Sequence, residues 1–149
     1  MKIEITKNGP YKVIGKVALS EKKLSSIDGK TEVVHLKDYP TQETTYLCRC
    51  GKSKNAPYCD GSHKSVFDGT LQAPYGKPTD HEVVNPEIAV MQNEIKGVSG
   101  PLSVSGNMKV FDGDHQYEQK PKVSLCRCGA SKNKPFCDGS HQAIGYKDR

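Results

Sequence analysis

The alternation of hydrophobic and polar positions along the chain predicts short strands rather than long helices. Val, Ile, Leu and Tyr are concentrated in residues 11–19 and 31–37, with Asp28–Gly29 between them. Apolar runs on either side of such a dipeptide predict a β-hairpin with long arms. The 3.6-residue apolar period that indicates amphipathic helices is weak throughout the chain.

The second half of the chain shows the same pattern in a shorter form. Residues 101–105 and 107–111 are typical of short strands, and Asp112–Gly113 is typical of a turn. Residues 88–96 fit a short helix and a strand equally well.

Two further short strands, at residues 44–47 and 122–125, each lead into a cysteine-rich segment. The short helices that the sequence favours most start at Asp60 and Asp138, near the end of each of these segments, because Asp is a good helix N-cap. The fold class is therefore expected to be mainly β, with short helices and loop–helix segments that carry the cysteines.

Composition limits the size and the class of the protein. The chain has 149 residues, 34% of them hydrophobic, and no Trp, so one domain or two small ones with a thin core are expected. No apolar run is long enough to span a membrane, and the first residues do not resemble a secretion signal, so we expect a cytoplasmic protein without a membrane partner. A net charge of +5 is low for a dedicated nucleic-acid binder.

The six cysteines form two triplets with the same spacing, and a His follows each triplet after four residues. The two sets are Cys48, Cys50, Cys59 and His63, and Cys126, Cys128, Cys137 and His141. A disulfide framework explains neither the recurring His nor cysteines in a chain without a targeting segment. Clustered Cys and His in this context predict two metal sites.

The repeat is wider than these residues. Residues 48–63 and 126–141 are identical at 13 of 16 positions, with an offset of 78. Further upstream, Gly9–Pro10 matches Gly100–Pro101 with an offset of 91, so the first copy carries 13 additional residues in between. This similarity indicates an internal duplication, packed as a pseudo-two-fold pair.

We therefore expect residues 1–149 to form a single pseudo-symmetric unit. Residues 1–68 would be the first repeat, 69–99 a connector rich in proline, and 100–149 the second repeat. A chain that contains its own symmetric partner is expected to be a monomer with an internal pseudo-dimer.

The spacing of the ligands suits a metal. In an extended segment, Cys48 and Cys50 point to one side and Arg49 to the other, and Gly51 then permits a sharp turn. Cys59 and His63 are four residues apart, near one face of a helical turn. A set of three Cys and one His suits tetrahedral zinc and a 2Fe-2S cluster alike, and the residues alone leave both metals open.

Both windows, residues 48–63 and 126–141, match the pattern C-x-C-x2-S-x3-P-x-C-D-G-S-H at every fixed position. This pattern resembles the CDGSH iron–sulfur (NEET) family, and the absence of an anchor resembles its soluble tandem type. The resemblance implies two 2Fe-2S clusters and a β-rich cap built by both halves. It also implies that the first two Cys of each window bind an inner iron, and that the third Cys and the His bind an outer iron.

The single His ligand in each window suggests two functions: electron transfer, and pH-sensitive delivery of a cluster. The partner would be a redox protein or an apo-acceptor protein. No catalytic motif is evident, so we expect a carrier rather than an enzyme. The alternative is a zinc-binding tandem Cys3His interaction module. The basic stretches 53–55 and 131–133 raise the question of RNA contact, but we favour a solvated surface that balances the charge of the site, so nucleic acid is not the expected partner.

Four other residues of the windows are expected to support the ligands. Ser53 and Ser131 would shape the loop and donate a hydrogen bond to a sulfur. Asp60 and Asp138 would act as helix caps.

Overall fold

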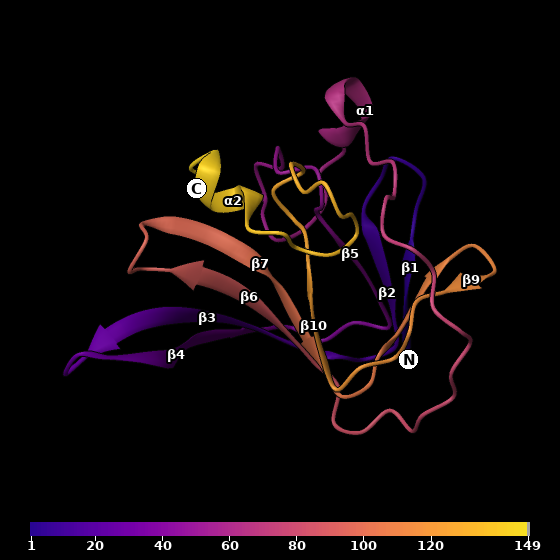
Figure 1. Cartoon of the computed structure of the whole chain (residues 1–149), viewed down its shortest axis with the longest axis horizontal. Coiled ribbons are helices and arrows are strands. Elements are labelled where there is room, and N and C mark those ends of the chain that lie inside the picture. The colour runs from indigo at the N-terminus through magenta and orange to yellow at the C-terminus, as the bar shows by residue number, and fades with distance from the viewer. Residues whose placement is uncertain (149) are drawn as a thin grey trace.

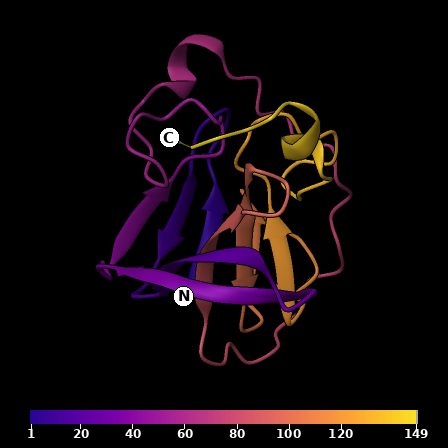
Figure 2. The ribbon, with the colours of Figure 1, turned by 90° about the vertical axis from the view of Figure 1, so that its left-hand side faces the viewer.

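The computed structural model describes residues 1–148, which form two five-stranded β-sheets and two single-turn helices. The sheets stand against each other, and both helices lie at one end of the molecule (Figures 1 and 2). The expected mainly-β class with a pseudo-two-fold arrangement is confirmed. None of the helices in this described part is long and apolar enough to cross a membrane.

The two sheets have equivalent strand orders: three strands from one half of the chain are followed by a hairpin from the other half. The first sheet contains, from edge to edge, β5 (Thr44–Leu47), β2 (Tyr11–Ile14), β1 (Lys2–Ile5), β8 (Lys109–Asp112) and β9 (His115–Gln116). The second contains β10 (Lys122–Leu125), β7 (Val98–Ser105), β6 (Glu87–Asn93), β3 (Ala18–Ile27) and β4 (Lys30–Tyr39). One parallel pair lies in each sheet, β1 with β8 and β3 with β6, and the other neighbours are antiparallel.

The two halves of the chain exchange hairpins. Strands β1, β2 and β5 of the first half form one sheet with the hairpin β8–β9 of the second half. Strands β6, β7 and β10 of the second half form the other sheet with the hairpin β3–β4 of the first half. The parallel pairs are the joints between the halves, so neither sheet is complete without both halves.

The longer hairpin accounts for the additional residues of the first copy. Strands β3 and β4 have 10 residues each, whereas β8 has four and β9 has two. The turn between β3 and β4 falls at Asp28–Gly29, as expected, with φ of 52° and 76°. Two consecutive positive φ angles are typical of the type I′ turn that suits a twisted hairpin.

The structure also corrects the sequence interpretation. Residues 11–19 do not form one hairpin arm, because the chain leaves the first sheet at Gly15 (φ 103°) and enters the second sheet as β3. Residues 88–96, which fitted a helix and a strand equally, are largely strand β6 (Glu87–Asn93). Since β6 pairs with β3 and β7, this part of the segment expected to be a connector belongs to the second sheet.

The core lies between the sheets and draws on both halves. Alternate residues are buried in β1, where Ile3 and Ile5 face inward, and in β2, whereas β6 buries Ile88, Ala89 and Val90 in a row. The same hydrophobic core contains the buried residues Tyr11, Leu47, Ile88, Val90, Leu102, Val104, Val110 and Leu125. Strands β5 and β10 begin and end as expected, and they deliver the two cysteine windows to the same end of the molecule (Figure 2).

Candidate metal centre

Each window is a loop that folds back on the strand leading into it. In the first window, the backbone N–H of Cys48 donates to Pro57 O (2.8 Å) and that of Cys59 donates to Tyr46 O (2.9 Å). The second window repeats both bonds, from Cys126 to Pro135 O (2.7 Å) and from Cys137 to Ser124 O (2.8 Å). These bonds hold the first and third cysteine of each window beside the end of the strand.

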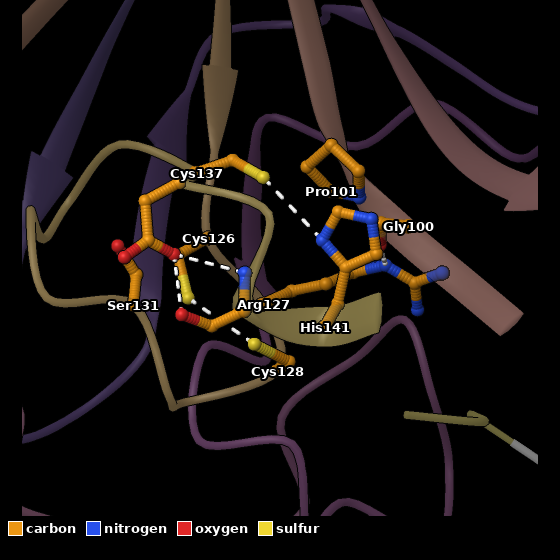
Figure 3. A pocket seen from close by; sticks show the side chains of 10 residues that line it. Gly100, Pro101, Cys126, Arg127, Cys128, Ser131, Cys137 and His141 are labelled. Carbon is orange, nitrogen blue, oxygen red and sulfur yellow. Dashed lines mark hydrogen bonds between the residues drawn. The ribbon is translucent and has the colours of Figure 1, made fainter. Parts of the chain in front are cut away.

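The ligands of each window form two close pairs. Cys48 Sγ lies 3.6 Å from Cys50 Sγ, and Cys59 Sγ lies 3.4 Å from His63 Nδ1. The spacings are 3.7 Å and 3.5 Å in the second window (Figure 3). Two sulfurs bound to one tetrahedral ion would be about 3.8 Å apart, and a sulfur and a nitrogen about 3.6 Å. Each pair is therefore spaced to share one metal ion.

The two pairs of each window line one small hollow. Within residues 1–148, no three His, Cys, Asp or Glu side chains converge on a single point that could hold an ion. A lone zinc ion needs all four ligands at one point, whereas a 2Fe-2S cluster needs two ligands on each of two irons. The residues present fit the cluster, because they offer two pairs across a gap.

The pairs differ in exposure. Cys48 and Cys50 are buried, whereas Cys59 and His63 are only half-buried. In the second window the first two Cys are likewise buried, but His141 is buried as well, with 7% of its surface exposed. The outer pair of the first window is thus the more accessible one.

The protonation of the thiols follows their surroundings. Burial raises the pKa of the Cys50 thiol to about 11, and it also raises the pKa of Cys137. A hydrogen bond from Cys128 lowers the pKa of Cys126 to about 6 and raises that of Cys128 in turn. A metal ion bound by both sulfurs of this pair would displace the proton of the hydrogen bond between them.

Of the two expected roles of the serines, shaping the loop is confirmed, because each hydroxyl also accepts from a backbone N–H of its loop, but donation to a sulfur is wrong. Ser53 donates to the carbonyl of Tyr58 rather than to a sulfur, at 2.5 Å, and Ser131 donates to the carbonyl of Phe136 at 2.6 Å. The backbone already supplies the donors to sulfur, because the turn after each second cysteine points an N–H at it. Those donors are the N–H groups of Lys52 to Cys50 Sγ (3.3 Å) and of Ala130 to Cys128 Sγ (3.4 Å).

The expected helix caps are also wrong. Helix α1 (His63–Val66) begins after Ser62 and helix α2 (Ser140–Ala143) after Gly139, and neither has a side-chain cap. Asp60 instead accepts hydrogen bonds from the N–H groups of Ser62 (3.0 Å) and Lys54 (2.8 Å) and ties the two arms of the loop together.

Asp138 plays the same part in the second window, accepting from the N–H groups of Ser140 (3.0 Å) and Lys132 (2.9 Å). Hydrogen bonds from Ser62 and Lys54 lower the pKa of Asp60 to about 2, and those from Ser140 and Lys132 do the same for Asp138.

The arginine between the first two cysteines is buried in both windows. Arg49 has 3% of its surface exposed and donates to the carbonyls of Gly9 (2.5 Å), Gly69 (3.0 Å) and Thr6 (2.9 Å). Arg127 has 1% of its surface exposed and donates to the carbonyls of Gly100 (2.7 Å) and Met91 (2.9 Å). Figure 3 shows Arg127 beside the ligands of the second window. These residues hold the loop against the sheet.

The two windows touch each other. Gly51 and Gly129 have φ of 78° and 83°, and a methyl group added at either would overlap the carbonyl of the opposite cysteine, Cys128 or Cys50. Tyr11 reinforces the contact, since its buried hydroxyl donates to Cys126 O (2.5 Å) with Pro135 O also in range (3.2 Å). Sequence reasoning missed Tyr11, and its only signal was that the matching position of the repeat holds Leu102.

The three remaining histidines lie outside the windows. His35 pairs with Asp38 at 2.9 Å, and His115 stacks on Tyr75 with 4.4 Å between ring centroids. The N–H of His81 donates to Gln119 at 2.7 Å.

Comparison with known proteins agrees with this site. The model of one family, described as "Iron-binding zinc finger CDGSH type", matches residues 8–64 and 99–142, which include both windows and more than half of the chain. No curated protein and no solved structure gives a significant match.

Proposed function

The chain belongs to the CDGSH iron-binding family, and from this premise we propose that it holds two 2Fe-2S clusters and acts as a one-electron carrier. The single observation that supports this most strongly is the spacing of the ligands, two close pairs across a hollow in each window. The second window has the same arrangement.

The proposed ligands are the eight residues expected from the sequence. Cys48 and Cys50 would hold one iron, and Cys59 and His63 the other. Cys126, Cys128, Cys137 and His141 would do the same in the second window. The bound group supplies a ferric/ferrous couple that takes up and releases one electron.

The protein's own residues tune this couple. The N–H groups of Lys52 and Ala130 point at Cys50 and Cys128, where they stabilise negative charge on sulfur. The burial of the inner pair excludes water from that side of the hollow. An imidazole in place of a fourth thiolate leaves the site less negative, which raises its potential. Electrons would therefore enter on the side of the outer pair.

A second candidate function is delivery of a cluster to an apo-acceptor protein. The observation that favours it is the half-exposure of Cys59 and His63 together. A thiol of an acceptor can approach these two ligands without displacing the buried pair, and protonation of the imidazole would weaken the outer attachment. An apo-ferredoxin is a suitable acceptor, and growth of its own spectrum would measure transfer.

The first experiment is a metal and spectroscopic analysis of the purified chain. We expect visible absorbance, an EPR signal after one-electron reduction, and about four irons with matching acid-labile sulfide per chain. A colourless protein with stoichiometric zinc would overturn the proposal in favour of a zinc-binding interaction module.

A ligand substitution tests the role of the histidine. His63→Cys is expected to keep a coloured protein, lower the potential of one cluster and increase its resistance to acid, because a thiolate adds negative charge and replaces the protonatable imidazole. His35→Cys, at an exposed histidine away from both windows, is the matched control and should change none of these. Loss of the cluster at the wild-type pH in His63→Cys would contradict this role.

We also propose a carrier rather than an enzyme, and a monomer. The internal exchange of hairpins already supplies a symmetric partner for each half. Gel filtration with light scattering checks the mass against 16.4 kDa.

A further inference from the structure

The two windows are nearly identical in sequence, but the buried arginines behind them are not equivalent. Arg127 forms an ion pair with Asp148 at 2.8 Å, and the side chains are 1% and 6% exposed. Asp148 also accepts from Gln92 (2.8 Å) and Ser99 (3.0 Å). The carboxylate is therefore held in a fixed position behind the second window.

Arg49 has no such partner. Within residues 1–148, its guanidinium donates to carbonyl oxygens and forms no ion pair. The carboxylate of Asp112 acts on it from across an open cavity that both residues line, and that carboxylate is itself bound by the Tyr75 hydroxyl at 2.5 Å.

The structure also indicates which residue replaces Asp148 in the first half. An aromatic ring covers each guanidinium, Phe67 at 4.9 Å over Arg49 and Tyr146 at 5.3 Å over Arg127. Counted from these rings, the position of Asp148 corresponds to Gly69. A Cβ at Gly69 would lie 2.5 Å from Phe67 Cε2 and 2.6 Å from Arg49 Nη2, so a side chain there would push the ring aside and meet the guanidinium.

Each window also carries one lysine without a counterpart in the other copy, Lys52 in the first and Lys134 in the second. Lys52 is exposed, whereas Lys134 is buried and donates to Ser131 O at 2.6 Å.

We propose that the one-sided Arg127–Asp148 ion pair makes the two windows unequal as electron sites, so that the first electron taken up resides at the first window. The inference rests on the proposed function, in which each window holds a 2Fe-2S cluster. An added electron is a negative charge, which Arg49, without an ion-pair partner, attracts and Asp148 repels. The greater exposure of His63 acts in the same direction, because water stabilises the added charge.

The electron balance is simple. A one-electron reductant, such as dithionite, gives one electron to the first window, where one ferric ion becomes ferrous. A second electron then enters the second window at a lower potential. The half-reduced protein is expected to carry its electron at the first window in at least about tenfold excess, which corresponds to about 59 mV.

An EPR-monitored redox titration of the full-length, cluster-loaded protein tests this inference. The wild type should show two one-electron steps. Asp148→Asn should raise the lower step toward the upper one, and Gly69→Asp should lower the upper step toward the lower one. Asp80→Asn is the charge-matched control. Asp80 is exposed, pairs with Lys109 on β8 at 2.6 Å and lines neither window's hollow, so its loss should leave both steps unchanged.

Each outcome is decisive. Two steps that respond to Asp148→Asn and Gly69→Asp in opposite directions support the proposal, and either variant alone suffices if the other fails to fold. Coincident steps in a protein with two clusters, or movement of the upper step by Asp148→Asn, would overturn this inference and leave the proposed function standing. A protein without iron would overturn both.

Discussion

At the scale of single residues, two buried tyrosines differ in whether the hydroxyl group forms a hydrogen bond. The hydroxyl of Tyr11 donates to carbonyls of the second window, so it joins a strand of the first half to the loop of the second. Within the described residues, the hydroxyl of Tyr117 is buried without a hydrogen-bond partner. Only the first hydroxyl therefore contributes a bond to the folded state.

This difference predicts opposite results for a matched pair of substitutions. Tyr11→Phe should lower the free energy of unfolding by about 1 kcal/mol, because it removes a satisfied buried bond. Tyr117→Phe should be neutral or stabilising, because it removes a group that loses its water on folding. Urea denaturation of both variants measures the difference, and equal losses would contradict the assigned bonds.

Asp148 predicts a dependence of stability on pH. Burial opposes its ionisation, but the charge and hydrogen bonds of Arg127, with those of Gln92 and Ser99, outweigh burial and hold its pKa below the ordinary value. A depressed carboxyl pKa stabilises the fold above about pH 4, the unfolded value, and this stabilisation is lost as the pH falls through the folded value.

Asp148→Asn should thus cost about 3 kcal/mol at neutral pH, where it leaves Arg127 buried without its ion-pair partner. The cost should shrink below about pH 4, where the wild-type carboxyl also becomes neutral. Urea midpoints of both proteins, each in the metal-free form, are compared at several pH values. A cost that does not change between neutral and acidic pH would exclude the ion pair as its source.

At the scale of elements, the two windows behave as one unit because their turns meet. Gly51 and Gly129 adopt the left-handed conformation and lie against the backbone of the opposite window. Gly29, at the tip of the hairpin β3–β4, has nearly the same φ (76°), but nothing lies within 4 Å of a Cβ there. A comparison of substitutions at Gly29 and Gly51 therefore separates the cost of backbone strain from the cost of disturbing the contact between the windows.

Gly29→Ala should cost about 1 kcal/mol, the price of the left-handed conformation for a residue with a Cβ. Gly51→Ala should cost at least about twice as much, because the methyl group also overlaps the carbonyl of Cys128. It should in addition perturb the second window, seen as a change in visible absorbance of the loaded protein. Equal costs would mean that the windows separate readily.

The sequence was most informative where a local signal decides the structure. The apolar residues before each window predict strands β5 and β10 with their observed ends, and Asp28–Gly29 predicts the turn of the long hairpin. It was least informative where distant segments decide. Nothing in residues 11–19 indicates that the chain changes sheets at Gly15, because the partner of β3 is a strand about 70 residues later.

The site divides in the same way. The spacing of Cys and His predicts the two groups of residues that the structure brings together. The roles of Ser53 and Asp60 depend on how the loop closes, which no short motif encodes. Asp148 was missed because its partner Arg127 lies 21 residues earlier in the chain.

At the scale of the whole molecule, a thin core predicts that the metal contributes much of the stability. The apolar fraction is 34%, and the loops that carry the ligands bury few apolar side chains of their own. Binding energy at a site that the unfolded chain lacks becomes folding energy. The loaded protein should therefore melt well above the metal-free protein.

Differential scanning calorimetry of the two forms checks this prediction. A supplementary comparison removes only the first site by Cys59→Ser, which should give an intermediate melting temperature if both sites stabilise the fold independently. Equal melting temperatures for the loaded and metal-free proteins would show that the strands alone hold the structure.

The exchange of hairpins has a mechanical consequence. Hairpin β3–β4 of the first half completes the sheet of the second half, and hairpin β8–β9 of the second half completes the sheet of the first. The two halves are therefore clasped together at two places. The stretch between them, residues 69–86, has no regular secondary structure. Cutting the chain there would give two fragments that remain clasped, and the halves could be supplied as separate polypeptides that assemble into the same molecule. The exchanged hairpins, rather than the covalent link, would then hold the two halves together.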